Sequence, residues 1–266
     1  MDLGLRDRIV VVTGASKGIG FACAQAFAAE GARVALVSRS RANLDAALAK
    51  IRHVEHPPVA FAADLSDAAQ SSAMVDDVES ALGPIDVLVN SAGAAKRYPP
   101  DELSPAAWRA AMDAKFFSYI HPLDAIIKRM GARGHGAVIN IVGMGGKVAN
   151  PVHLPGGAAN AALMLATAGL AAAYGPKGVR VNAINPGGTL TGRVQEGLAA
   201  EARMTGLTPE DLLERQQARI PLRRLGMPEE VAQVAIRQRV TQMRAGSPQR
   251  TLVHRARPPR TAEPRV

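Results

Sequence analysis

Six short apolar segments alternate with longer segments of helical pattern, and this alternation limits the folds open to the chain. The apolar segments are rich in Val and Ile and cover residues 9–12, 34–37, 59–62, 87–89, 138–142 and 179–184. Continuous apolar strands of this kind suit a parallel sheet that is covered on both faces. Segments of helical length lie between them, at 18–30, 41–52, 67–82 and 157–174. The order predicts an α/β protein with a doubly wound parallel sheet, the Rossmann fold.

Length and composition favour one domain in a reducing compartment. The 266 residues suit a single α/β domain, which we place at 1–235. The single cysteine, Cys23, cannot form an intrachain disulfide. The first ten residues carry acids and do not resemble a secretory signal. The longest membrane-like stretch, 161–173, is too short to span a bilayer. We therefore expect a cytoplasmic protein without a membrane partner.

The net charge of +9 is concentrated at the carboxyl end. Residues 236–266 contain eight Arg and one Glu, so the rest of the chain is close to neutral. A basic segment can bind polyanions, but this one lacks the interleaved aromatic residues that stack on bases. Nucleic acid is therefore an unlikely partner. A weaker hypothesis keeps it as one, and predicts salt-dependent DNA binding that is lost when 236–266 are deleted.

A glycine-rich segment follows the first predicted strand and opens the first predicted helix. Residues 13–20 read Thr-Gly-Ala-Ser-Lys-Gly-Ile-Gly. Glycines permit a tight turn and a close approach of the backbone to a phosphate, and the helix N-terminus offers free N–H groups. At this junction the pattern indicates a site for the pyrophosphate of a dinucleotide, formed by Gly14, Ser16, Gly18, Ile19 and Gly20.

Five motifs in order, each at the end of a predicted strand, resemble the short-chain dehydrogenase/reductase family over about 230 residues. The glycine-rich segment is the first of them. The others are Asp64-Leu65, Asn90-Ser91-Ala92-Gly93, Asn185-Pro186-Gly187 and Thr191. The resemblance implies a nicotinamide cofactor and a small-molecule substrate, with no metal ion. It places Asp64 and Leu65 at the adenine, and assigns the rest of the cofactor to Asn90, Ala92, Gly93, Pro186, Gly187 and Thr191.

The end of the second predicted strand bears on the choice of cofactor. A carboxylate there would bind the ribose 2′-hydroxyl of NAD. This chain has Ser38 followed by Arg39, and Lys17 adds a second cation within the glycine-rich loop. Cations at these positions can pair with a 2′-phosphate. We therefore expect NADP(H) rather than NAD(H), the alternative being that both cations are solvated surface charges.

The residues that carry the family's chemistry are replaced at the positions that resemble its motifs. The resemblance implies a tetrad of Asn, Ser, Tyr and Lys, and its four positions fall on Lys115, Gly143, Gly156 and Asn160. The three tyrosines of the chain are Tyr98, Tyr119 and Tyr174, and none is followed four residues later by Lys. Glycine has no proton to donate, and Asn160 is uncharged. The usual ketone–alcohol mechanism should therefore be crippled.

Two interpretations of this atypical active site remain open. In the first, the chain is an oxidoreductase in which a partly buried Lys115 has a lowered pKa and acts as an acid or as an electrostatic anchor, while Asn160 hydrogen-bonds ribose hydroxyls. His153 and Tyr119 are secondary candidates, and Lys115 itself could be a surface lysine. In the second, the chain is a nucleotide-binding pseudoenzyme or a partner subunit without turnover.

The carboxyl end departs from the family after the segment 225–232. The resemblance implies a further helix and a seventh strand, but residues from 236 onward are rich in Arg and Pro instead. We take 236–266 as a frameshift product or as a genuine disordered basic tail. Absence of a family-like ending in both shifted frames of the gene would exclude the frameshift. Loss of the seventh strand would expose a sheet edge, and a homo-oligomer is expected only if that edge is intact.

Overall fold

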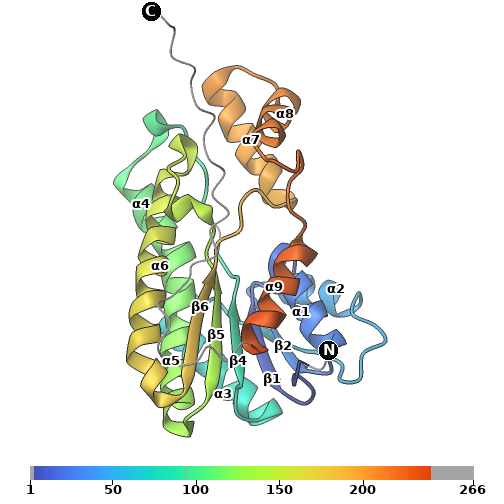
Figure 1. Cartoon of the computed structure of the whole chain (residues 1–266). Coiled ribbons are helices and arrows are strands. Elements are labelled where there is room, and N and C mark those ends of the chain that lie inside the picture. The colour runs from blue at the N-terminus through green and yellow to red at the C-terminus, as the bar shows by residue number, and fades with distance from the viewer. Residues whose placement is uncertain (1–2, 94, 241–266) are drawn as a thin grey trace, which may run out of the picture.

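A computed structural model describes residues 3–93 and 95–240 and contains one six-stranded parallel sheet (Figure 1). Its strand order is β3-β2-β1-β4-β5-β6. The chain reverses direction across the sheet between β1 and β4, as in a doubly wound fold. This confirms the predicted fold class and all six predicted strands: β1 (Ile9–Thr13), β2 (Arg33–Ser38), β3 (Val59–Ala62), β4 (Val87–Asn90), β5 (Gly136–Ile141) and β6 (Val179–Ile184).

Side chains of the central strands are buried on both faces of the sheet. In β1, Val10 and Val12 belong to one hydrophobic cluster, whereas Ile9 and Val11 belong to another on the opposite face. Successive side chains of a strand point to opposite faces, so an uninterrupted apolar strand can fill two cores at once. This is why the strands lack the polar alternation of a sheet with one wet face.

Helices cover both faces and the carboxyl ends of the strands (Figure 1). One face is covered by α1 (Gly18–Ala29), α2 (Arg41–Leu48) and α9 (Pro228–Val240). The other is covered by α3 (Ala68–Leu82), α5 (Ser118–Arg133) and α6 (Leu154–Tyr174). Three further helices follow loops at the carboxyl ends: α4 (Pro105–Ala111), α7 (Gly192–Thr205) and α8 (Pro209–Ala218). A π-helix at Met112–Phe117 joins α4 to α5.

Four of these helices begin at a side-chain cap, whereas α1, α5, α6 and α7 do not. Ser40, Asp67, Ser104 and Thr208 each accept a hydrogen bond from a backbone N–H in the first turn of α2, α3, α4 and α8. Such caps satisfy N–H groups that have no partner inside the helix. Helix α1 follows Lys17 and has no side-chain cap. Its first-turn N–H groups therefore remain available to a ligand.

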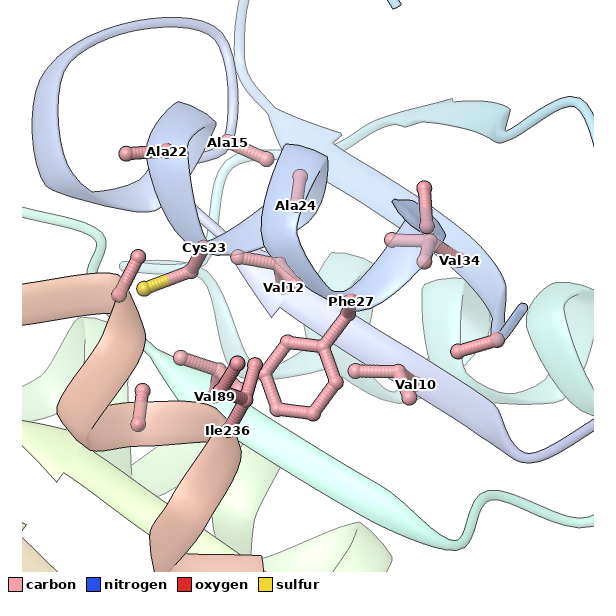
Figure 2. Packing of buried hydrophobic residues seen from close by; sticks show 14 of the residues in the cluster. Val10, Val12, Ala15, Ala22, Cys23, Ala24, Phe27, Val34, Val89 and Ile236 are labelled. Atoms are coloured by element: carbon pink, nitrogen blue, oxygen red, sulfur yellow. The ribbon is translucent and has the colours of Figure 1, made fainter. Parts of the chain in front are cut away.

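Helix α9 extends the folded domain past the boundary expected at residue 235. It runs to Val240, and Ala235 and Ile236 are completely or almost completely buried. Figure 2 shows Ile236 against the ring of Phe27, which comes from α1, beside Val10. The correction has a simple cause: the apolar residues at 231, 232, 235 and 236 continue a helical spacing, which the neighbouring arginines obscure in the sequence.

The remaining expectations for the carboxyl end fall on residues 241–266, which lie outside the described part of the chain. Within residues 3–93 and 95–240, β6 pairs with β5 only, and no seventh strand joins it. The frameshift and the basic tail therefore stay hypotheses.

Helix α6 is longer than the apolar stretch expected at 161–173. With its flanking 3-10 turns it covers Pro151–Lys177, which by length and composition alone could cross a membrane. A helix that covers a sheet in a water-soluble domain passes the same test. Its buried residues include Asn160 and Thr167 as well as Leu163, and it lies along β6 and β5 in Figure 1. In this fold α6 is a layer of the domain.

We predict that Ile236→Ala destabilises the domain by about 2–4 kcal/mol, because it removes buried methylene groups and leaves a cavity beside Phe27. Val234→Ala is the matched control: Val234 lies on the exposed side of α9, and its truncation should cost less than about 0.5 kcal/mol. Urea unfolding followed by circular dichroism measures both. Equal losses for the two variants would show that α9 does not pack on the core.

Candidate active site

The loops at the carboxyl ends of β1, β4, β5 and β6 meet at one edge of the sheet. In open parallel sheets, ligands bind outside the carboxyl ends of the strands where the strand order reverses. Here that point lies between β1 and β4, the strands that precede the glycine-rich loop and the Asn90 loop. The topology thus brings together the motifs that lie far apart in the sequence.

Two glycines of the glycine-rich loop lie too close to neighbouring backbone to carry a side chain. Gly14 has a φ of +65°, and a Cβ on it would lie 2.7 Å from the carbonyl oxygen of Ser91. A Cβ on Gly20 would lie 2.3 Å from the carbonyl oxygen of Gly14. Both glycines are therefore required by the turn itself. A Cβ on Gly18 would lie 3.5 Å from the side chain of Thr191, so the loop after β6 borders this turn.

Asn90 points into the protein interior. Its side chain is fully buried, and its Nδ2 donates to Asn140 Oδ1 at 3.0 Å. The backbone N–H groups of Ser91 and Ala92 donate to Thr13 Oγ1 at 3.0 and 3.1 Å. These bonds fix the loop after β4 against β1. Any role of Asn90 in cofactor binding is therefore limited to its backbone and to positioning of this loop.

Ser38 ends β2 and Arg39 follows it, whereas Lys17 lies in the glycine-rich loop after β1. Arg39 and Lys17 are exposed, and neither forms an ion pair within the described residues. Ser38 accepts a hydrogen bond from Ser40 N at 3.4 Å, which shapes the turn after β2. Both cations are thus free to meet a ligand, Arg39 at the end of β2 and Lys17 at the start of α1.

Asp64 and Leu65 form the turn after β3. The backbone N–H and the hydroxyl of Ser66 both donate to Asp64, and these bonds, together with the nearby Arg39, lower the pKa of Asp64. Leu65 is buried, and its carbonyl oxygen lies 3.0 Å from Nδ1 of His121. The carboxylate of Asp64 therefore stays ionised beside the end of β2.

The turn after β6 is tied to the loop after β5. Met144 N donates to Pro186 O at 2.9 Å, which sets the Pro186-Gly187 turn beside the loop that contains Gly143. Gly187 is exposed, and a Cβ on it would meet nothing within 4 Å. This turn therefore presents open backbone to the cleft.

Gly143, Gly156 and Asn160 lie together, as the resemblance implies for their positions. A Cβ on Gly143 would lie 3.4 Å from Asn160 Nδ2. A Cβ on Gly156 would lie only 2.1–2.7 Å from atoms of the His153 ring. The imidazole of His153 therefore occupies the space from which a side chain at position 156 would start. Asn160 is buried, and its Oδ1 has no hydrogen-bond partner among the described residues.

Lys115 projects from the π-helix and is held by two oxygen atoms. Its Nζ donates to Tyr119 Oη at 2.7 Å and to the carbonyl oxygen of Ile141 at 3.1 Å. The Tyr119 hydroxyl in turn donates to the same carbonyl at 2.6 Å. A lysine ammonium has three donors, so one N–H remains for a ligand. Segments of π-helix recur at functional sites, where they redirect side chains.

Burial sets the protonation of this group of residues. Desolvation, with a smaller contribution from Arg193, lowers the pKa of Lys115 to about 7. Burial raises the pKa of Tyr119 well above its ordinary value. Burial, with nearby Arg97, Lys115 and Arg193, lowers the pKa of His153 to about 4. At neutral pH, Lys115 is therefore the group that exchanges a proton most readily.

Sequence reasoning missed Arg97 and Arg193. Arg97 lies in the loop after β4, and Arg193 begins α7 after β6. Both positions follow a strand at its carboxyl end, which was the available signal. Neither belongs to a motif, so nothing in the sequence distinguished them from ordinary surface arginines.

The residues present fit a bound dinucleotide. Gly14 and Gly20 permit the tight turn that leads into α1, and the first turn of α1 has uncapped N–H groups suited to a pyrophosphate. Asn160 Oδ1 is a buried acceptor without a partner in the described chain, and a ribose hydroxyl would satisfy it.

Comparison with known proteins finds matches over most of the chain. A family model described as short chain dehydrogenase matches residues 8–202. D-threitol dehydrogenase of Mycolicibacterium smegmatis is 36% identical over 71% of this chain and 73% of its own length. L-Sorbose reductase from Gluconobacter frateurii, crystallised with NADPH and L-sorbose, superposes with a TM-score of 0.82 at 28% identity and covers 90% of this chain and 92% of its own. An NAD+-bound xylitol dehydrogenase gives a TM-score of 0.82 at 25% identity, with 86% and 91% coverage.

We predict that Lys115→Met stabilises the domain near neutral pH. The folded-state pKa of Lys115 is lowered to about 7 from 10.5, so between these values the unfolded chain holds the extra proton and the stability of the original protein rises with pH. The gain from Lys115→Met should therefore be about 1 kcal/mol or more at pH 6.5 and should shrink towards pH 10. Thermal unfolding across this pH range measures it.

Lys50→Met is the control, since Lys50 is exposed at the end of α2. It should change the unfolding free energy little and by the same amount at every pH. A Lys115→Met gain that does not vary with pH would contradict the lowered pKa.

Proposed function

The chain belongs to the short chain dehydrogenase family, and we propose that it is an NADP(H)-linked oxidoreductase that uses Lys115 as its acid and base. Its reaction interconverts a hydroxyl and a carbonyl group on a small molecule. The observation that carries the proposal is the position of Lys115. It is partly buried at the cofactor edge of the sheet, with a pKa lowered to about 7 and one donor left free.

The cofactor would be held mainly by backbone. The turn at Gly14–Gly20 and the first turn of α1 would bind the pyrophosphate, Asp64 and Leu65 would border the adenine, and Arg39 and Lys17 would pair with the 2′-phosphate. Ala92 and Gly93 would border it at the end of β4, while the Pro186-Gly187 turn, Thr191 and Asn160 would lie towards the nicotinamide. When bound, the nicotinamide supplies or accepts the hydride.

Lys115 would donate the proton in reduction and accept it in oxidation. In reduction, the carbonyl carbon gains a hydride, and the Lys115 ammonium gives one proton to the carbonyl oxygen, which yields an alcohol and a neutral amine. In oxidation, the neutral amine takes the hydroxyl proton as the hydride leaves the carbon. A pKa near the working pH serves both steps, because each protonation state is populated.

Tyr119 and His153 are poorer candidates for this proton. The Tyr119 hydroxyl donates to Ile141 O and has a raised pKa, so it holds its proton. The pKa of His153 is about 4, so at pH 7 its imidazole is neutral and the protonated form that would act as the acid is scarcely populated. We assign to Tyr119 the positioning of Lys115, because it accepts the 2.7 Å hydrogen bond from Nζ. His153 packs over Gly156 and closes that side of the site.

The compounds named for the relatives support a hydroxyl-bearing substrate. D-threitol dehydrogenase and L-sorbose reductase are named for a polyol and a ketose. We propose the same broad class for this chain, with a secondary hydroxyl or a ketone as the reacting group.

We predict that the protein binds NADPH more tightly than NADH, and that Arg39→Ala removes most of the difference. Loss of one cation from the 2′-phosphate should weaken NADPH binding by about tenfold or more and leave NADH binding within about twofold. Arg41→Ala is the control, since it removes an equal charge two residues away that already pairs with Asp45. Isothermal titration calorimetry with both cofactors gives the dissociation constants. Equal affinity of the unmodified protein for both cofactors would contradict the NADP(H) assignment.

We predict that Lys115→Met lowers kcat by about 10²–10⁴-fold, the usual contribution of general acid–base catalysis, without loss of NADPH binding. In the unmodified enzyme, reduction should slow as pH rises above about 7, and oxidation should slow as pH falls below it. Steady-state rates across a panel of ketones and polyols between pH 5.5 and 9.5 measure both. Tyr119→Phe should shift the pH profile while keeping part of the rate.

Two results would contradict the assignment. A Lys115→Met variant with unchanged kcat would exclude Lys115 as the acid. An unmodified protein that binds NADPH but turns over none of the panel would favour a cofactor-binding protein without hydride transfer.

A further inference from the structure

Lys115 and two arginine side chains form a group of three cations at this site. The reaction proposed above uses only Lys115. This cationic cluster consists of Lys115, Arg97 from the loop after β4, and Arg193 from the first turn of α7. Arg193 is exposed, and Arg97 and Lys115 are partly buried. Each of the three residues therefore keeps some exposure to solvent.

Backbone contacts hold Arg193 close to Lys115. Arg193 Nη2 donates to the carbonyl oxygen of Gly93 at 2.8 Å. Gly93 itself lies against the π-helix, since a Cβ on it would fall 1.8 Å from the carbonyl oxygen of Ala114. Ala114 directly precedes Lys115. Arg193 is thereby held close enough to Lys115 to contribute to the lowering of its pKa.

Arg97 completes the cluster from the far end of that loop. Tyr98 N donates to Val152 O at 3.1 Å, which brings Arg97 next to the turn that carries His153. The Arg97 guanidinium packs on α7 at Gly197, where a Cβ would lie 2.9 Å from its Cζ. Gly197 is buried, and its lack of a side chain provides the space for this arginine.

No carboxylate neutralises these charges by direct contact. Within the described part of the chain, none of the three forms an ion pair. Glu196 and Glu201 of α7 act on Arg97, and Glu196 also acts on Arg193, in each case without an ion pair. Burial lowers the pKa of both arginines, and Arg97 also lowers that of Arg193. Like charges held together in a partly desolvated site are costly unless an anion joins them.

We infer that the cationic cluster binds an acidic group of the substrate, so that the enzyme acts on a hydroxy or keto compound bearing a carboxylate or a phosphate. Arg97 and Arg193 would hold the acidic group through paired N–H donors, which match the geometry of these anions. The reacting oxygen would then lie at Lys115. This inference rests on the proposed function and names the substrate class of the same site.

The cofactor pyrophosphate is the other anion that Arg193 could meet. Arg193 is two residues from Thr191, which borders the glycine-rich loop at Gly18. Arg97 argues for the substrate: it packs against α7 at Gly197 and lies beside the His153 turn, not beside the loop at Gly18. We therefore assign the cluster to the substrate and treat the cofactor as an outcome of the test.

Binding of matched acidic and neutral compounds tests the inference without requiring turnover. The full chain saturated with NADP+ is titrated by calorimetry with 5-keto-D-gluconate, D-fructose 6-phosphate and 4-oxopentanoate. D-Fructose and methyl 4-oxopentanoate serve as neutral partners. We expect at least one acid to bind at least tenfold more tightly than its neutral partner. Arg97→Gln should weaken that acid by about 10- to 100-fold, the effect of losing one charge-assisted hydrogen bond, and change the neutral compounds less than twofold.

Lys96→Gln is the matched control, because it removes the same charge from the adjacent, exposed residue. It should leave the binding of the acids unchanged. Failure of all three acids to bind the unmodified protein, or equal losses for Arg97→Gln and Lys96→Gln, would overturn the inference. Arg193→Gln separates the two anions: weaker NADPH binding with unchanged acid binding would assign Arg193 to the cofactor and contradict its part in the cluster. Arg97-dependent acid binding without turnover would reject the proposed reaction and leave the anion site standing.

Discussion

A chain of buried side-chain hydrogen bonds crosses the carboxyl end of the sheet and fixes the loops of the site. Asn90 Nδ2 donates to Asn140 Oδ1 at 3.0 Å, and Asn140 Nδ2 donates to Thr167 Oγ1 at 2.9 Å. Thr13 Oγ1 donates to Asn90 Oδ1 at 3.4 Å and accepts hydrogen bonds from the backbone N–H groups of Ser91 and Ala92. All four side chains are buried. An unpaired polar group here would cost about 1–3 kcal/mol, so the network holds β1, β4, β5 and α6 in one arrangement.

The position of Lys115 follows from this arrangement. Because the loop after β4 is bound to Thr13, Gly93 is held against the π-helix with a φ of +84°. A side chain at Gly93 would collide with the Ala114 carbonyl, which instead accepts the Ser118 hydroxyl at 2.9 Å. The widened turn of the π-helix then directs Lys115 over the end of β5, where its Nζ donates to Ile141 O and Tyr119 Oη. The proposed acid is thus placed by backbone packing, not by an opposite charge.

The sequence could predict what depends on local pattern. Uninterrupted Val and Ile runs located all six strands, and the glycines at 14 and 20 located the tight turn between β1 and α1. Features that depend on tertiary contact could not be read in this way. The burial of Ile236 depends on Phe27, over 200 residues earlier, and the position of Arg97 depends on the Tyr98–Val152 hydrogen bond and on packing against Gly197. The partial burial expected of Lys115 could be established only from the structure. The spacing of residues in the sequence does not distinguish a lysine packed over a strand end from one in solvent.

The substitutions at the proposed site are mutually consistent. If Gly156 and Asn160 stand where the family has tyrosine and lysine, restoring that pair meets two physical obstacles. A tyrosine at 156 would collide with the His153 ring, whose atoms lie within 2.7 Å of the Cβ position. A lysine at 160 would add a fourth cation to a site where Lys115 already has a lowered pKa. A protonated lysine at position 160 would lower the pKa of Lys115 further, because like charges at short range repel one another. The site therefore suits one protonated lysine, on α6 or on the π-helix, better than two. In the proposed reaction, neutral side chains at positions 156 and 160 of α6 would leave the proton to Lys115 on the π-helix.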